Sequence, residues 1–278
     1  MVSGSVVLAL WVTLFISLFL PVIILIVYAL KYKKMGVVSG WFVGAAGFFV
    51  TQIVVRVPIL SVLGTQQWFI DFANNNYVLY ALILGFTAGL FELVGRYAAA
   101  KLLSKNQSFE RGFAAGLGHG GIEAMVLIGM TYVSNLLYVG MINSGSFDAV
   151  VEQTAALGVD TSALLLVKEQ LVSASPVLFY CAGYERILTM IGHVAMSLIV
   201  FYAVWKKQDV KGILVCLALH TLIDSGSAII MGLNPQAAGQ MTFNGTYAAV
   251  YGFLTVMAVI FVVIIVKIKK NWTLKAEA

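Results

Sequence analysis

The chain of 278 residues is 61% hydrophobic and only 10% charged, with a formal net charge of +5 and a mean hydropathy of +0.96. A typical globular chain is about 25% charged, so this chain has too little charge to cover a surface that faces water. The composition excludes a soluble domain and a disordered chain, and it indicates a polytopic membrane protein. Cys181 and Cys216 both lie in apolar runs, which is typical of packed thiols rather than of a disulfide framework.

Long apolar segments recur along the whole chain. A membrane helix needs about 20 predominantly apolar residues, and seven segments reach that length. In chain order they are Ser5–Leu30, Val37–Leu63, Tyr77–Ala100, Gly112–Gly140, Leu178–Val204, Gly212–Gly232 and Thr246–Val266. We therefore predict an all-α fold, a bundle of about seven transmembrane helices that forms one integral membrane domain over residues 1–278.

The charged residues between these segments indicate an orientation. With the N-terminus outside, the inner connections hold most of the 17 basic residues, whereas the outer ones hold only Lys168. This is the distribution that the positive-inside rule describes. We predict a multi-pass protein of the plasma membrane with a cytoplasmic C-terminus, whose first segment is a retained anchor. The basic pI of about 9.1 then reflects topology, and no nucleic-acid partner is expected.

Two further patterns concern packing. The longest outer segment, Met141–Pro176, contains the run Ala163–Val172, which is expected to form a short helix on the outer surface or dipping into it. Glycines recur at four-residue spacing in the second and fourth segments, and this spacing lets helix backbones approach closely. These glycines are Gly36, Gly40, Gly44, Gly112, Gly116 and Gly120.

Several ionisable residues lie inside the predicted spans. They are Arg56, Glu92, Arg96, His119, Glu123, Glu185, Arg186, His193, His220 and Asp224. A charge at the centre of the bilayer costs about 2.5–3.5 kcal/mol on insertion scales. These side chains must therefore pair with one another, line a wet cavity or bind a ligand. For Arg56, which is alone on its span, we favour a structural ion pair.

The spacing of these residues places them on shared helix faces. Residues four apart on a helix lie on one face, as in the pairs Glu92–Arg96, His119–Glu123 and His220–Asp224. All three histidines of the chain fall near mid-membrane, or slightly inward of it, on three different spans. Histidine is the side chain for proton transfer near neutral pH and a common metal ligand, so we interpret the cluster as a functional site. The glycines that flank His119 are expected to leave room for a substrate or a kink.

Two kinds of hydrolytic chemistry fit this cluster. A carboxylate in a partly dry cavity can act as a general base for water, while histidine and aspartic acid stabilise the oxyanion. Alternatively, a zinc ion could be held by His119, His193 and His220 together with Glu123 or Asp224. The chain contains no HExxH motif, so the zincin pattern is absent.

Short motifs in the third to sixth spans carry a resemblance. They are Phe91-Glu92-Leu93-x-x-Arg96, Gly118-His119-Gly120-Gly121-Ile122-Glu123, Glu185-Arg186 with His193, and His220-x-x-x-Asp224. In order and spacing they resemble the YhfC family of intramembrane metalloproteases, which is grouped with the CAAX-protease and bacteriocin-processing superfamily. The resemblance covers residues 77–232 and implies a catalytic-like core of four helices there.

The resemblance also implies roles for single residues. Glu92 and Arg96 match the first motif of the superfamily, His119 the second, and His220 with Asp224 the last. A glutamate of the first motif would activate water, and the last motif would help to hold the oxyanion. The chain departs from the superfamily at Phe91, where paired glutamates would place the expected base. Glu123 is therefore a rival to Glu92 for that role.

We predict an intramembrane peptidase that cuts a membrane-embedded or membrane-adjacent peptide near the inner half of the lipid bilayer. Its catalytic residues would be Glu92, Arg96, His119, Glu123, His220 and Asp224, with His193 as a further zinc ligand and Glu185 and Arg186 in support. One alternative is a transporter for a proton-coupled solute or a divalent cation, although the odd number of spans and the lack of an inverted repeat weigh against it. The other is a non-catalytic scaffold or immunity protein of the same fold.

Overall fold

The structure is a computed structural model that describes residues 1–276, with side chains described for residues 1–272. The described residues contain seven helices that are long and apolar enough to cross a membrane. They are Gly4–Lys31, Val37–Leu63, Tyr77–Leu102, Phe109–Ser144, Pro176–Trp205, Asp209–Gly232 and Gly245–Trp272. Within the part of the chain that the structure describes there is no strand. The predicted all-α architecture is confirmed.

Some spans consist of more than one helical element. The first joins α1 (Gly4–Leu14), the π-helical turn η1 (Phe15–Phe19) and α2 (Leu20–Lys31), and the second joins α3 (Val37–Phe48), η2 (Phe49–Arg56) and α4 (Val57–Leu63). The others are α6 (Tyr77–Leu102), α7 (Phe109–Glu123) with η4 (Ala124–Gly129) and α8 (Met130–Ser144), α11 (Pro176–Trp205), α12 (Asp209–Gly232) and α14 (Gly245–Ala276). The fourth span exceeds its predicted bounds at both ends. Ser108 caps its start by accepting the Arg111 N–H, and Gly145 ends it with a φ of +81°.

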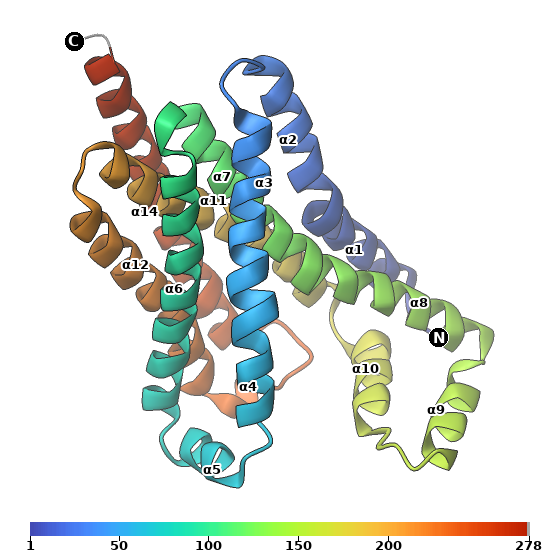
Figure 1. Cartoon of the computed structure of the whole chain (residues 1–278). Helices are drawn as coiled ribbons and strands as arrows, with labels where there is room; N and C mark the ends of the chain where they lie inside the picture. Colours follow the sequence, from blue (N-terminus) through green and yellow to red (C-terminus); the bar gives the residue numbers. More distant parts are fainter. Residues whose placement is uncertain (277–278) are drawn as a thin grey trace.

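Short helices fill the connections. They are α5 (Gln67–Asn75), η3 (Ser104–Asn106), α9 (Phe147–Ala156), α10 (Ser162–Ser173) and α13 (Pro235–Ala238). The predicted helix at Ala163–Val172 is confirmed as α10, whereas α9 was not predicted. Both project away from the main bundle (Figure 1). Leu171 of α10 is buried in a small core with Leu10 of α1 and Tyr132 of α8, so the projection is packed onto the first and fourth spans.

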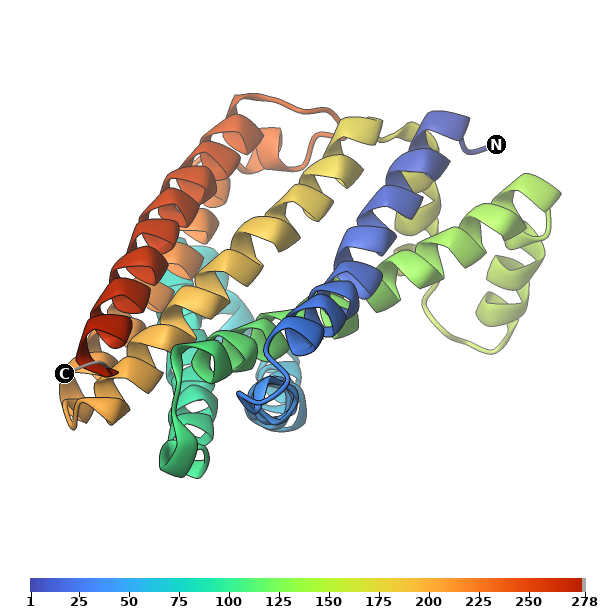
Figure 2. The same cartoon turned by 90° about the horizontal axis from the view of Figure 1, so that it is seen from above.

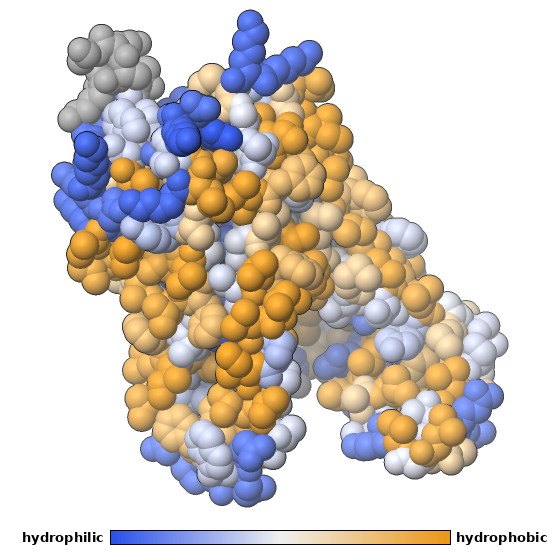
Figure 3. Space-filling model, in the orientation of Figure 1, coloured by the Kyte–Doolittle hydropathy of each residue, from blue (hydrophilic) through white to orange (hydrophobic). Residues whose placement is uncertain are grey.

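Helix α11 lies at the centre of the bundle. Seen from above it runs between α1 and α14, and it also packs on α7 and α12 (Figure 2). On the visible face, apolar residues cover the middle of the molecule, and hydrophilic residues gather at its two ends (Figure 3). We call the end that carries the connections α2–α3, α6–α7 and α11–α12 the lysine-rich end. Lysines there include Lys31, Lys33, Lys34, Lys105, Lys206 and Lys207. The positive-inside rule predicts that this end is cytoplasmic.

The glycines of the second and fourth spans allow close contact between helices. A Cβ atom on Gly44 of α3 would lie 1.9 Å from the Ala115 carbonyl oxygen of α7, and one on Gly118 would lie 1.9 Å from the Trp41 carbonyl oxygen. On another face of α7, a Cβ on Gly116 would lie 2.5 Å from the Cα of Val194 on α11. The predicted packing role of the small residues is confirmed.

The expectation that glycines beside His119 leave room for a substrate or a kink is wrong. A Cβ on Gly120 would lie 2.9 Å from the His193 side chain, and one on Gly121 would lie 3.1 Å from Pro21. Helix α7 continues through His119 to Glu123 without a kink-forming break. The space beside each glycine is filled by a neighbouring helix, so these glycines bring the helices that carry the site together.

Gly118→Ala is expected to lower the free energy of unfolding by about 3 kcal/mol, because the added methyl meets a backbone oxygen that cannot rotate away. Gly252→Ala on α14 is a matched control, since nothing lies within 4 Å of its added Cβ. The control should be neutral or slightly stabilising. Thermal unfolding in detergent measures both, and equal stability of the two variants would contradict the close α3–α7 contact.

Candidate functional site

Glu92 lies at the centre of the buried polar cluster. Its carboxylate accepts N–H groups from Arg96, one turn further along α6, at 2.8 Å and from Gln52 of η2 at 2.8 Å. The Nε2 of His119 on α7 lies 3.1 Å from the same carboxylate. All four side chains are buried. Three helical segments therefore meet at the Glu92 carboxylate. A buried charge is costly unless it is paired and hydrogen-bonded, and Glu92 has both kinds of partner.

Arg96 connects this carboxylate to the two other histidines. Its guanidinium contacts His193 Nδ1 at 2.7 Å and His220 Nδ1 at 3.2 Å. Arginine can only donate hydrogen bonds, so each Nδ1 is the acceptor, and in the neutral imidazole the proton then sits on Nε2. Arg96 thereby sets the same tautomer in both rings and points both Nε2–H groups away from itself.

Each of these Nε2–H groups faces a carboxylate. His193 Nε2 lies 2.6 Å from Glu123 Oε2, and His220 Nε2 lies 3.2 Å from Asp224 Oδ2. Glu123 also accepts an N–H from Arg186 at 3.0 Å, and Arg186 pairs with Glu185 as well. The structure thus brings together every residue of the predicted cluster. Their catalytic and supporting roles stay predictions.

Three of these side chains form a group that could bind a metal ion. One ligand atom from each of Glu92, His119 and His193 lies within 4.8 Å of the others. Two imidazoles and a carboxylate are a donor set of catalytic zinc sites, in which water takes the remaining position. The donor types and spacing therefore fit a metal. His193 Nδ1 accepts an N–H from Arg96 through its single lone pair, so metal binding at that atom requires this hydrogen bond to break, whereas a Glu92 oxygen can accept from Arg96 and bind a metal at once.

This group differs from the predicted metal ligands, which were His119, His193 and His220 with Glu123. Glu92 takes a place in the group, whereas His220 lies outside it, with its Nε2 3.7 Å from Glu92 Oε1. Glu123 contacts the group only through His193. Helical periodicity showed which residues share a face, but it did not show which atoms converge between four helices. The predicted ligand set and the geometric group therefore share His119 and His193 and differ in His220 and Glu92.

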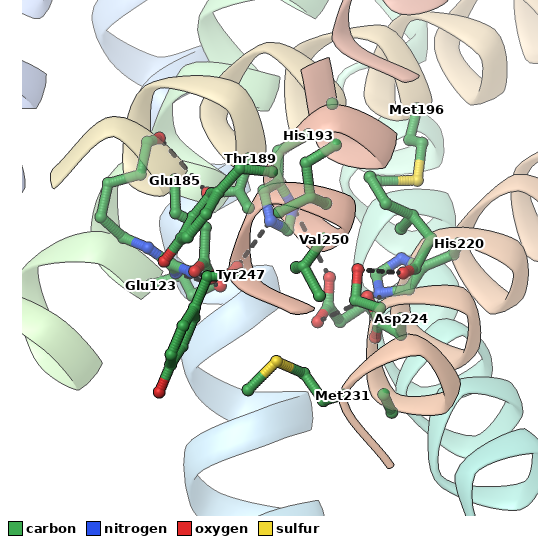
Figure 4. A pocket seen from close by; sticks show the side chains of 18 residues that line it. Glu123, Glu185, Thr189, His193, Met196, His220, Asp224, Met231, Tyr247 and Val250 are labelled. Atoms are coloured by element: carbon green, nitrogen blue, oxygen red, sulfur yellow. Dashed lines mark hydrogen bonds and ion pairs between the residues drawn. The ribbon is translucent and has the colours of Figure 1, made fainter. Parts of the chain in front are cut away.

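A cavity of about 410 Å³ adjoins the cluster. Glu92, Glu123, His193, His220 and Asp224 line one part of it, and α14 closes the other side (Figure 4). The α12 residues that line it run from His220, at the middle of that helix, to Met231, near the end away from the lysine-rich end. The α11 residues that line it run from Glu185 to Met196, across the middle of that helix. Cleavage near the inner half of the bilayer stays a prediction.

A sequence model of the YhfC intramembrane metalloprotease family matches residues 16–236, which include the whole cluster. The chain belongs to this family. The resemblance inferred from the motifs is confirmed. The chain is similar to the "Uncharacterized membrane protein YhfC" of Bacillus subtilis (strain 168), with 30% identity over 226 residues, which are 81% of this chain and 84% of that protein. No solved structure matches the chain.

This YhfC-family protein is a multi-pass membrane protein, and its buried Glu/His/His group is compatible with the metalloprotease name of the family.

Two features of the site were not predicted from the sequence. Gln52 contacts Glu92, and Arg56, expected to form an ion pair, instead donates to Gln52 Oε1 at 3.3 Å and to the Leu84 carbonyl at 2.9 Å. A search for amides as well as charges inside apolar spans would have found Gln52. The cavity wall on α14 lies beyond the predicted core of residues 77–232.

Proposed function

We propose that this YhfC-family protein is an intramembrane peptidase of the plasma membrane that hydrolyses a peptide bond at the Glu92 cluster. The observation that carries this proposal is the buried Glu92–His119–His193 group beside a cavity that is also lined by the Glu123 carboxylate and by His220. Hydrolysis needs an activated water, a donor to the oxyanion and space for the substrate. Each has a candidate among the residues that line this cavity.

Glu92, His119 and His193 would hold a zinc ion, which when bound supplies Lewis acidity toward water and the peptide carbonyl. The Glu123 carboxylate lies 2.6 Å from His193 Nε2 and would orient that ring, as carboxylates commonly do for histidine ligands. Both Glu92 and Glu123 line the cavity, but Glu92 would hold the metal and already contacts Arg96, His119 and Gln52, so we assign the general base to Glu123.

His220 is the proposed donor to the oxyanion. It lines the cavity, and Arg96 at Nδ1 leaves a proton on Nε2 that can be donated. Asp224 accepts from this Nε2 when the cavity holds no substrate, which keeps the ring oriented. Preorganised donors of this kind stabilise the charge that develops on the carbonyl oxygen.

The test is cleavage of membrane-protein and peptide substrates by the protein in proteoliposomes, read by mass spectrometry. Glu123→Gln and His220→Ala are each expected to lower turnover by about 100-fold or more, the usual loss for a general base or an oxyanion donor. Asp148→Asn on the projecting helix α9 is the control and should cleave normally. Normal turnover by either site variant would contradict its assigned role. Solute uptake that the same variants abolish, without any cleavage by the wild type, would instead favour the transporter hypothesis.

A further inference from the structure

The cavity beside the site has an apolar wall. Ile223 and Met231 of α12 and Val250 and Leu254 of α14 line it, and Ile223, Val250 and Leu254 are buried. In Figure 4, Val250 and Met231 border the same space as Asp224 and His220. A wall of this kind recognises a ligand by removing its apolar surface from water. The polar groups of the site therefore act next to a surface suited to an apolar side chain.

The mouth of the cavity is acidic. The side chains of Glu185 and Asp224 are 33% and 40% exposed, far more than that of Glu92 at 7%. Arg186 is shared between Glu185 and Glu123, so one guanidinium faces two carboxylates. No lysine or arginine among the described residues forms an ion pair with Asp224, whose contact is His220. The mouth keeps an excess of negative charge and so attracts a cation.

We propose that the cavity binds a peptide segment that places a leucine-sized apolar side chain against Val250 and Leu254 and an ammonium group at Asp224, the exposed carboxylate that has no lysine or arginine partner among the described residues. The ammonium belongs to a lysine or to a free amino terminus. The volume of about 410 Å³ lies within the usual range of ligand sites, roughly 300–1,000 Å³. This inference names the substrate class of the same site and therefore rests on the proposed function. Peptides with a carboxylate at the mouth are rejected by like charge.

Binding of four matched fluorescent peptides to the purified full-length protein in detergent tests this inference. The peptides combine leucine or alanine at one position with lysine or glutamate at a neighbouring one, and anisotropy gives each Kd. We expect the leucine–lysine peptide to bind tightest. The leucine peptides should bind at least tenfold more tightly than the alanine peptides, because even one methylene in an apolar pocket changes discrimination by about 10–200-fold. The lysine peptides should bind several-fold more tightly than the glutamate peptides, and this difference should grow at low salt.

Variants of the protein test the apolar wall and the acidic part of the cavity one at a time. Val250→Trp fills the apolar wall and should remove the preference for leucine, whereas Val256→Trp, at a position on the same helix that is 60% exposed, should keep it. Met231→Ala enlarges the apolar space and should shift the preference from leucine toward phenylalanine, measured with a fifth peptide that carries phenylalanine in place of leucine, which keeps the test valid if the tryptophan variant misfolds. Asp224→Asn should reduce the preference for lysine and leave that for leucine unchanged.

The outcomes distinguish this inference from the proposed function. Selective binding without cleavage would overturn the peptidase proposal and support the ligand class. Cleavage without preference among the four peptides would overturn the ligand class alone. Failure of all four peptides to bind, or a preference for glutamate over lysine, would overturn the inference.

Discussion

Arg96→Met is expected to lower the free energy of unfolding by about 3–5 kcal/mol, because it leaves the buried Glu92 carboxylate without its cation. The same change also removes the N–H groups that hold the Nδ1 atoms of His193 and His220. Methionine keeps much of the volume of the side chain, so a cavity does not account for the loss. Thermal unfolding of the purified protein in detergent, followed by intrinsic fluorescence, measures the effect as a fall in Tm.

The double variant Arg96→Met with Glu92→Gln distinguishes charge from packing. Neutralising Glu92 removes the unpaired charge, so the double variant is expected to recover most of the stability lost by Arg96→Met alone. Lys101→Met is the control, because its ion pair with Asp209 lies at the surface, where such pairs contribute little. Equal losses in the single and double variants would show that the unpaired carboxylate is not the cause.

The spans and the members of the cluster could be predicted because both follow from rules that act along one helix. Twenty apolar residues define a span such as Val37–Leu63, and the structure has the same bounds. Four-residue spacing places Glu92 and Arg96 on one face, where the structure shows them hydrogen-bonded. Because charge inside a membrane is costly, charged residues within an apolar span stand out in the sequence as candidate members of the cluster.

The arrangement between helices could not be predicted in the same way. Periodicity gives the face of each helix, whereas contacts such as Gln52 with Glu92 depend on how far the helices are rotated about their axes and on their depth. Gln52 is uncharged, so a search for charged residues alone passes over it, and its sequence position does not show that it contacts Glu92. The difference between the predicted ligand His220 and Glu92 of the geometric group has the same cause, because only side-chain geometry separates the three histidines.

Zinc affinity is expected to depend more strongly on the three members of the group, Glu92, His119 and His193, than on the residues that contact them. Glu92→Gln, His119→Ala and His193→Ala should each weaken zinc affinity by more than about 100-fold, since each removes a member of the group. Glu123→Gln should weaken it by roughly 10–100-fold, the usual loss when the carboxylate behind a histidine ligand is neutralised.

The measurement is zinc content by mass spectrometry after dialysis against zinc buffers, with monodispersity and Tm as checks on folding. His220→Ala is the deciding variant, because the sequence assigned His220 to the metal whereas the geometry places it outside the group. It should keep zinc affinity within a few-fold of the wild type while losing turnover, since its proposed role is donation to the oxyanion. A loss of zinc as large as that of His119→Ala would restore the three-histidine site. If the wild type itself fails to take up zinc, the zinc assignment is wrong, and Glu92 and Glu123 would have to act on water without a metal.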